Sequence, residues 1–246
     1  MQIIPAFVTQ NKCYQAGAPL TPRDIMLHSV GTPQPSARAL VRYMDQYQPG
    51  GQSVCVHAVA QADGTVYQLL PWEMRGWHCG GSANSTHIGV EMTEPSAGMT
   101  RSEAAEQIAG TYRTVVELFA ELCKQYDLDP VQDGVLIGHA EGHRRGAASN
   151  HADPELLWQQ YCTGCTMDGF RRDVAEAMAK EDREEVPDMP RYDSVAEMPQ
   201  WARADAQRLI DRGALQGNTD GKLDVSEDML RTMIVCQRMV DEQKET

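Results

Sequence analysis

The sequence of 246 residues lacks a long hydrophobic run and a leader pattern at its start. No apolar stretch approaches the roughly 18 residues that a helix needs to span a bilayer. Residues 1–17 lack the basic start and apolar core that are typical of a secretory signal. We therefore expect a protein that is made in the cytoplasm, without a signal peptide and without membrane insertion. A substrate beyond the membrane would then require another agent to release it.

Positive charge is also scarce, since 22 Lys and Arg stand against 35 Asp and Glu, a net charge of −13. Residues 1–180 carry 13 basic and 19 acidic side chains, a net −6, and residues 181–246 carry 9 and 16, a net −7. The shorter carboxyl-terminal part is therefore the more acidic per residue. Nucleic acid binding requires a basic surface, so this balance argues against a nucleic acid partner.

The cysteines lack the pattern of a disulfide framework, because seven of them are scattered along the chain. Free cysteines most often act as small buried hydrophobic residues, and we expect that role for most of these. Cys162 and Cys165 form a single C-x-x-C. A structural zinc site would need a second such pair, and the sequence has none. A redox or metal role for this pair stays open.

What the sequence has is an alternation of strand and helix patterns. Apolar runs predict strands at 25–30, 87–92 and 134–139, and Asp63-Gly64 predicts a hairpin turn. Helices are expected after Ser36, after Thr100 with a capping box to Glu103, and near residues 154–161. Interleaved strands and helices indicate an α/β (α+β) domain with a central mixed β-sheet flanked by helices.

The pattern changes near residue 180. Residues 1–179 make up the predicted α/β domain, and residues 180–198 are charged, contain prolines and have the composition of a linker. Residues 199–246 predict a small helical module with one helix between Pro199 and Gly213 and a second helix capped at Ser226. So small a unit buries little surface, which favours packing on the main domain or self-association.

The histidines offer a candidate metal site. His28 and His139 stand at the ends of two predicted strands, and the polar loop after His139 delivers His151 and Asp153 just before a proline. A catalytic zinc takes three protein ligands and one water, so the two histidines and one residue from this loop meet that count. Glu91 lies in an apolar strand, where a carboxylate needs a partner, and a general base beside such a metal is a suitable role.

These residues fall in a series of motifs: LHS at 27–29, DGTVYQ at 63–68, WHCGGS at 77–82, HIGVE at 87–91, GHAEG at 138–142 and NHADP at 150–154. Their order resembles the zinc-dependent N-acetylmuramoyl-L-alanine amidases of the amidase type 2 and peptidoglycan recognition protein family, from about residue 20 to about residue 175. The resemblance implies one Zn²⁺ per chain in a groove that holds the stem peptide of peptidoglycan.

Carried over by motif, the resemblance implies metal ligands at His28, His139 and Asp153 and a catalytic base at Glu91. It places His151 where relatives often have a lysine that stabilises the oxyanion, which implies a catalytic role for His151. It also implies that His78 lines the substrate groove. Some phage relatives have a catalytic tyrosine at the position of Val56.

Several alternatives stay open. His151 in place of Asp153 would give a three-histidine zinc site. The protein could bind peptidoglycan without cleaving it, or it could recycle soluble muropeptides in the cytoplasm. An endolysin of a phage or prophage, released to the cell wall by a holin, is the simplest setting without a signal peptide. Residues 199–231 weakly resemble one repeat of a surface-layer-homology module, which would suit wall attachment or self-association.

Overall fold

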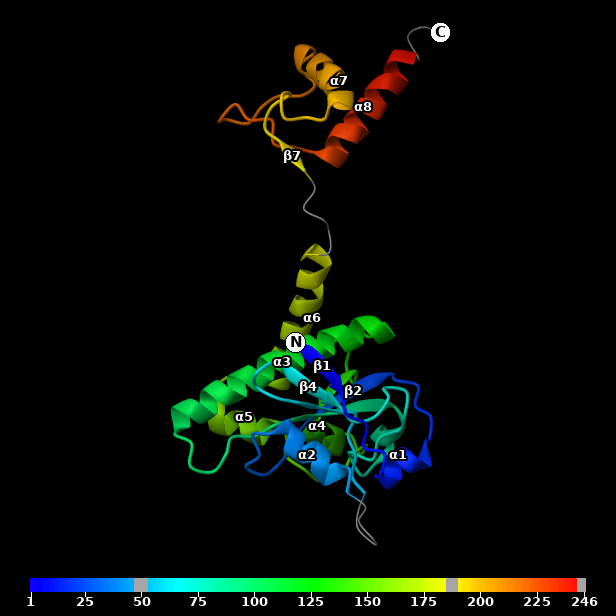
Figure 1. The fold of residues 1–246 in the computed structure, drawn as a ribbon, viewed down its shortest axis with the longest axis vertical. Coiled ribbons are helices and arrows are strands. Elements are labelled where there is room, and N and C mark those ends of the chain that lie inside the picture. Colours follow the sequence, from blue (N-terminus) through cyan, green and yellow to red (C-terminus); the bar gives the residue numbers. More distant parts are fainter. Residues whose placement is uncertain (47–52, 185–189, 243–246) are drawn as a thin grey trace. The chain divides into compact units, whose positions relative to one another are not determined.

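The structure is a computed structural model that describes residues 1–46, 53–184 and 190–242. The chain forms two compact units, Met1–Glu181 and Asp182–Thr246 (Figure 1). The second unit therefore includes most of the segment predicted to be a linker, and residues 185–189 of that segment lie outside the described residues. No helix of the described ranges is both long and apolar enough to cross a membrane.

The first unit is built on a six-stranded mixed sheet with the order β1-β4-β3-β5-β2-β6. β3 and β4 pair antiparallel, and the other neighbours pair parallel. The strands are β1 (Gln2–Pro5), β2 (Asp24–Ser29), β3 (Ala58–Ala60), β4 (Thr65–Gln68), β5 (His87–Met92) and β6 (Leu136–Gly138). The predicted strands at 25–30, 87–92 and 134–139 and the Asp63-Gly64 hairpin are confirmed, as is the mixed central sheet.

Helices flank this sheet as predicted, and two of them begin at the expected caps. Ser36 accepts a hydrogen bond from the Ala39 amide at the start of α2, and Thr100 and Glu103 form the capping box of α3. The helices of this unit are α1 (Lys12–Ala16), α2 (Ala37–Met44), α3 (Arg101–Tyr126), α4 (His139–Arg144), α5 (Glu155–Tyr161) and α6 (Met167–Glu184), with a short 3-10 helix, η1 (Ser82–Ser85).

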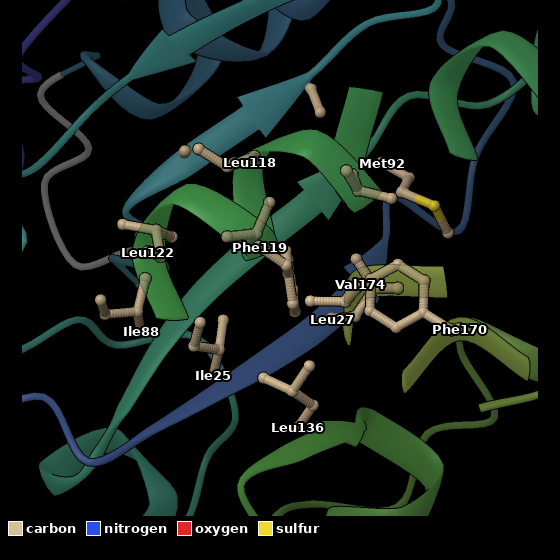
Figure 2. Close-up of a cluster of buried hydrophobic side chains, with 14 of the residues drawn as sticks. Ile25, Leu27, Ile88, Met92, Leu118, Phe119, Leu122, Leu136, Phe170 and Val174 are labelled. Carbon is tan, nitrogen blue, oxygen red and sulfur yellow. The ribbon is translucent and has the colours of Figure 1, made fainter. Parts of the chain in front are cut away.

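One face of the sheet packs against α3, α5 and α6. Alternate residues of β2 and β5, including Ile25, Leu27 and Ile88, point into this core, where they meet Phe119 of α3 and Phe170 of α6 (Figure 2). Side chains alternate between the two faces of a strand. His28 and Glu91 therefore belong to the opposite face, and the β2–β5 register places them directly beside one another.

The other face of the sheet is covered in part by α2. Leu40 and Met44 of this helix pack with Val59 of β3 and with Leu69 and Leu70, which follow β4. The covering is incomplete at the carboxyl ends of β2, β5 and β6. Because parallel strands end at the same edge of a sheet, the residues at these three ends lie close together.

Some sequence predictions need correction. His139 does not end a strand: it is the first residue of α4, and part of the expected loop is this helix. α3 ends at Tyr126, before the predicted stop at Asp129-Pro130, because Asp127 adopts a left-handed conformation there. Cys162 and Cys165, for which packing, redox and metal roles were open, form a disulfide bond.

The second unit has a core of its own. Its helices are α7 (Gln200–Asp211) and α8 (Glu227–Glu242), and the short strands β7 (Arg191–Tyr192) and β8 (Val225–Ser226) pair antiparallel. Both predicted helices are confirmed, including the Ser226 cap, whose hydroxyl accepts from the Met229 amide. The core consists of buried side chains from both helices and their connection: Met198, Ala202, Ala206, Leu209, Leu215, Val225, Leu230 and Ile234.

Candidate active site

Three side chains from separate parts of the first unit converge at the exposed edge of the sheet. His28 comes from the end of β2, His139 from the start of α4, and Asp153 from the residue before α5. His28 Nδ1 lies 3.0 Å from His139 Nδ1 and 3.3 Å from Asp153 Oδ2, and His139 Nδ1 lies 3.7 Å from Asp153 Oδ1. Both imidazoles are buried, and the carboxylate is partly buried.

This arrangement fits a metal ion. Two imidazole nitrogens and one carboxylate oxygen are a common donor set for zinc, and tetrahedral ligands with bonds of about 2.0–2.2 Å stand about 3.3–3.6 Å apart. The observed separations of 3.0–3.7 Å match that spacing. Among the described residues, His28, His139 and Asp153 form the group whose ligand atoms all lie within 4.8 Å of one another.

The electrostatics of the group suit a cation as well. Burial lowers the pKa of His139 to about 4, so its imidazole is neutral and able to coordinate at pH 7. Burial raises the pKa of the Asp153 carboxyl, but the hydrogen bond with His28 and the charges of His28 and His139 outweigh it, and the net shift is downward. The carboxylate is therefore ionised, which is the form that binds metals.

Glu91 lies beside this group on β5, opposite His28 in the register of the sheet. Its Oε2 atom is shielded from solvent and has no hydrogen bond partner among the described residues. Burial raises the pKa of Glu91 to about 7, against the opposing effect of His28. A buried polar atom without a partner calls for an explanation, and a carboxyl that titrates near neutral pH suits proton transfer.

The group opens into a groove with a volume of about 1090 Å³. His151 lies on its wall, where the exposed imidazole stacks on His139 with ring centroids 4.6 Å apart. His78 and Trp77 also line the groove, as does Val56 at the position of the relatives' tyrosine. The sequence thus brings His28, His139, Asp153, Glu91, His151 and His78 into one place.

Two further histidines lie outside the metal-compatible group. His57 is fully buried, donates from Nε2 to the Met74 carbonyl and accepts from the Gly89 amide at Nδ1. Burial lowers its pKa to about 4. His87 is hydrogen-bonded through Nδ1 to the Thr86 hydroxyl, and burial lowers its pKa to about 4 as well. These contacts indicate a structural role for both histidines.

Sequence reasoning missed Ser149 and Glu94. The Ser149 hydroxyl lies 3.2 Å from His139 Nε2. The Ser149 backbone amide donates to the Cys79 carbonyl, and this hydrogen bond joins the loop after α4 to the loop before η1. Glu94 lines the groove and accepts a hydrogen bond from the Gly31 amide. Both residues lie in polar loops, and the residues around them give no indication that they lie beside the site. Spacing alone therefore could not have identified them.

The family model described as N-acetylmuramoyl-L-alanine amidase matches residues 18–156, a span that holds every residue of the group. The chain belongs to this amidase family. The predicted family and the predicted activity, hydrolysis of the amide bond between N-acetylmuramic acid and L-alanine in peptidoglycan, are thereby confirmed. No curated protein sequence matches the chain.

Solved structures with a similar fold include a hydrolase, a catalytic domain and an endolysin. The hydrolase AmiA of Staphylococcus aureus, in complex with its ligand, is 18% identical, covers 76% of this chain and 88% of its own, and has a TM-score of 0.60. The catalytic domain of XlyA is 21% identical, with 71% and 99% covered and a TM-score of 0.54. A mutant endolysin from Bacillus subtilis is 20% identical, with 71% and 99% covered and a TM-score of 0.51.

Proposed function

We propose that this amidase is zinc-dependent, with one zinc ion per chain held by His28, His139 and Asp153. The observation that carries the proposal is the convergence of the two Nδ1 atoms and a carboxylate oxygen within 3.0–3.7 Å in the groove. When bound there, zinc supplies a Lewis acid that polarises the scissile carbonyl and lowers the pKa of water from about 15.7 toward about 7.

Glu91 acts as the general base in this proposal. Its shielded Oε2 atom accepts the proton of the attacking water and later passes it to the leaving amine of L-alanine. Catalytic acids and bases work best with a pKa near the operating pH, and the pKa of Glu91 is raised to about 7 by burial. Glu91 lies beside His28, and its Oε2 atom has no hydrogen bond partner in the part of the chain that the structure describes, so it is available to a water molecule.

His151 acts on the developing oxyanion. Its imidazole is exposed to the groove and stacks on His139 outside the metal-compatible group, which supports this role. As an imidazolium it donates a hydrogen bond to the oxyanion, a contribution of roughly 2.7–4 kcal/mol in other hydrolases. Trp77 and His78 contribute to the wall of the groove that receives the stem peptide.

The biological setting we propose is cell-wall lysis by a phage or prophage endolysin that a holin releases. The similarity in fold to a Bacillus subtilis endolysin supports this setting. The second unit, with its own core and its exposed Trp201, Met229 and Val235, is the proposed wall-binding or self-association module. A recycling role on soluble muropeptides would need no such module.

Zinc content and reaction products test the chemistry together. The purified full-length protein should contain one zinc, release L-alanine amino groups from intact walls, stop after treatment with a chelator and recover with added zinc. Binding to walls without release of amino groups would instead identify a recognition protein without catalysis. Cleavage of soluble muropeptides but not of intact walls would identify a recycling enzyme.

A pair of variants tests the third ligand. His151→Lys should keep zinc and appreciable activity and should extend activity to higher pH, because an ammonium keeps its positive charge to higher pH than an imidazolium does. Asp153→Ala should lose zinc. A zinc-free His151→Lys protein beside a zinc-loaded Asp153→Ala protein would replace our assignment with a three-histidine site.

A further inference from the structure

His78 is hydrogen-bonded to the back of one metal-compatible histidine. His28 directs Nδ1 toward His139 and Asp153, and its other ring nitrogen, Nε2, lies 2.9 Å from His78 Nδ1. The second nitrogen of His78, Nε2, lies 3.2 Å from the carbonyl oxygen of His87. The carbonyl, His78 and His28 therefore form a continuous line of hydrogen bonds that ends at the candidate metal position.

The chemistry of the carbonyl fixes the direction of this line. A carbonyl oxygen only accepts, so His78 Nε2 carries a hydrogen and donates. A neutral imidazole has a single N–H, which in His78 is engaged at Nε2 by the His87 carbonyl. His78 Nδ1 is therefore an acceptor, and the His28 nitrogen that faces it must donate. With the hydrogen placed on His28 Nε2, Nδ1 is the nitrogen that faces the candidate metal position.

The fold holds the His78 ring in the orientation that this line requires. Its backbone amide donates to Asn84 Oδ1 at 2.9 Å, and its ring meets that of His28 edge to face, at 79°. Gly89, in the middle of β5, leaves the space that the ring occupies, since a Cβ at that position would overlap the imidazole. Gly76 borders the same ring.

We propose that His78 is a positioning residue that holds His28 as the Nε2–H tautomer and thereby presents the Nδ1 lone pair to the metal ion. This inference rests on the proposed zinc-dependent function and gives His78 a role beyond lining the groove. The other histidine differs in this respect. His139 Nε2 faces the Ser149 hydroxyl, which can donate or accept, so Ser149 does not select a tautomer.

The test uses two substitutions of similar branched shape in the full-length protein. His78→Asn keeps an acceptor near the position of Nδ1, and His78→Leu removes it while losing comparable ring packing. We expect His78→Leu to raise the Kd for zinc about 10–100-fold, the usual effect of removing the partner of a ligating histidine, and His78→Asn to raise it only a few-fold. His143→Ala, on the exposed end of α4, is the matched control and should leave the Kd unchanged.

Nitrogen-15 NMR of the imidazoles in the zinc-free protein reads the tautomer directly. Wild-type His28 should be protonated at Nε2, and in His78→Leu the Nδ1–H form should appear. Thermal unfolding of the zinc-free variants checks that both fold. Equal zinc affinity of folded His78→Leu and wild type, equal losses in the Asn and Leu variants, or an Nδ1–H wild-type His28 would each overturn the inference.

These outcomes are separable from failure of the proposed function. A wild-type protein that binds no zinc, or a His28→Ala protein that binds it as well as wild type, would overturn the zinc site itself. A zinc-loaded, active wild type with an insensitive His78→Leu variant would leave the zinc site standing and remove only the role of His78.

Discussion

The two units of this amidase differ in where their titratable side chains lie and in how far these are buried. The first unit holds all seven histidines of the chain, and four of them line one groove with Glu91 and Asp153: His28, His78, His139 and His151. The second unit has no histidine, and both partners are exposed in its Arg191–Asp224 and Lys222–Asp193 ion pairs. Burying charged groups without full pairing lowers the free energy of unfolding. The residues of the candidate active site should therefore reduce the stability of the first unit.

The difference between the two units is greatest at the proposed metal ligands. His139→Ala should lose the bound zinc and reduce amidase activity to the background rate, a larger effect than the roughly 10²–10⁴-fold expected for an acid–base residue. Metal analysis and the release of amino groups from walls measure both. His143→Ala, from the same helix, is the control, and full zinc content with full activity in His139→Ala would refute the assigned site.

Glu91→Gln should separate chemistry from stability. We expect kcat to fall about 10²–10⁴-fold with little change in substrate affinity or zinc content, because a base acts only in the transition state. The zinc-free variant should also unfold at a higher temperature than wild type at pH 8, since it no longer buries an ionised carboxylate. Wild-type turnover in this variant would return Glu91 to a structural role.

Acid should destabilise the zinc-free first unit and leave the second nearly unchanged. His57, His87 and His139 have pKa values of about 4, below the 6.5 of a free histidine. The unfolded chain therefore binds more protons, and stability that is fully present above pH 6.5 is lost as the pH falls toward 4. For a fully buried histidine such as His57 the loss from pH 7 to pH 5 is about 1–2 kcal/mol.

Glu91 opposes this trend, because its pKa of about 7 exceeds that of a free glutamate, so its contribution to stability grows as the pH falls through 7 toward 4.5. The stabilisation from Glu91 on acidification offsets the destabilisation from about one of the three histidines. Hydrogen exchange at pH 7 and pH 5 can follow β5 and α7 separately. If β5 and α7 lost protection against hydrogen exchange equally at pH 5, the predicted difference in acid stability between the two units would be wrong.

The smallest effect is expected for removal of the second unit. A chain ending at Glu184, the last residue of α6, keeps every proposed catalytic group. It should cleave soluble muropeptides at the full-length rate and clear intact walls several-fold more slowly, on the order of 1 kcal/mol of lost wall binding. Equal clearing by both chains, with the same oligomeric state, would leave the second unit without the proposed role.

The sequence predicted those parts of the molecule that local chemistry determines. Strands β2 and β5, the Ser36 cap and the Thr100–Glu103 box each follow from a few neighbouring residues. The expected positions of His28 and His139 at strand ends suggested a metal site, and the resemblance to the family added Asp153 as the third ligand. The contribution of β1 and α1 to the fold was not predicted, since neither has a marked hydrophobic period.

The remaining features depend on contacts between distant segments. His139 was expected to end a strand because the five residues before it, GVLIG, are apolar. In the structure the Gly138 amide donates to the Glu141 carboxylate, and α4 begins at His139. The bond between His78 and His28 joins residues 50 positions apart, and no local pattern encodes it. The raised pKa of Glu91 likewise arises from burial that only the folded chain produces.

Gly89 has a consequence for how sequences of this fold can vary. The imidazole of His78 fills the space where a side chain at position 89 would begin. Glycine weakens a central strand, and it often marks a site where another group approaches the backbone closely, as the His78 ring does here. Positions 78 and 89 should therefore change together: relatives with a side chain at the position of Gly89 should carry a smaller residue at that of His78, and would have to orient the first zinc histidine by another contact.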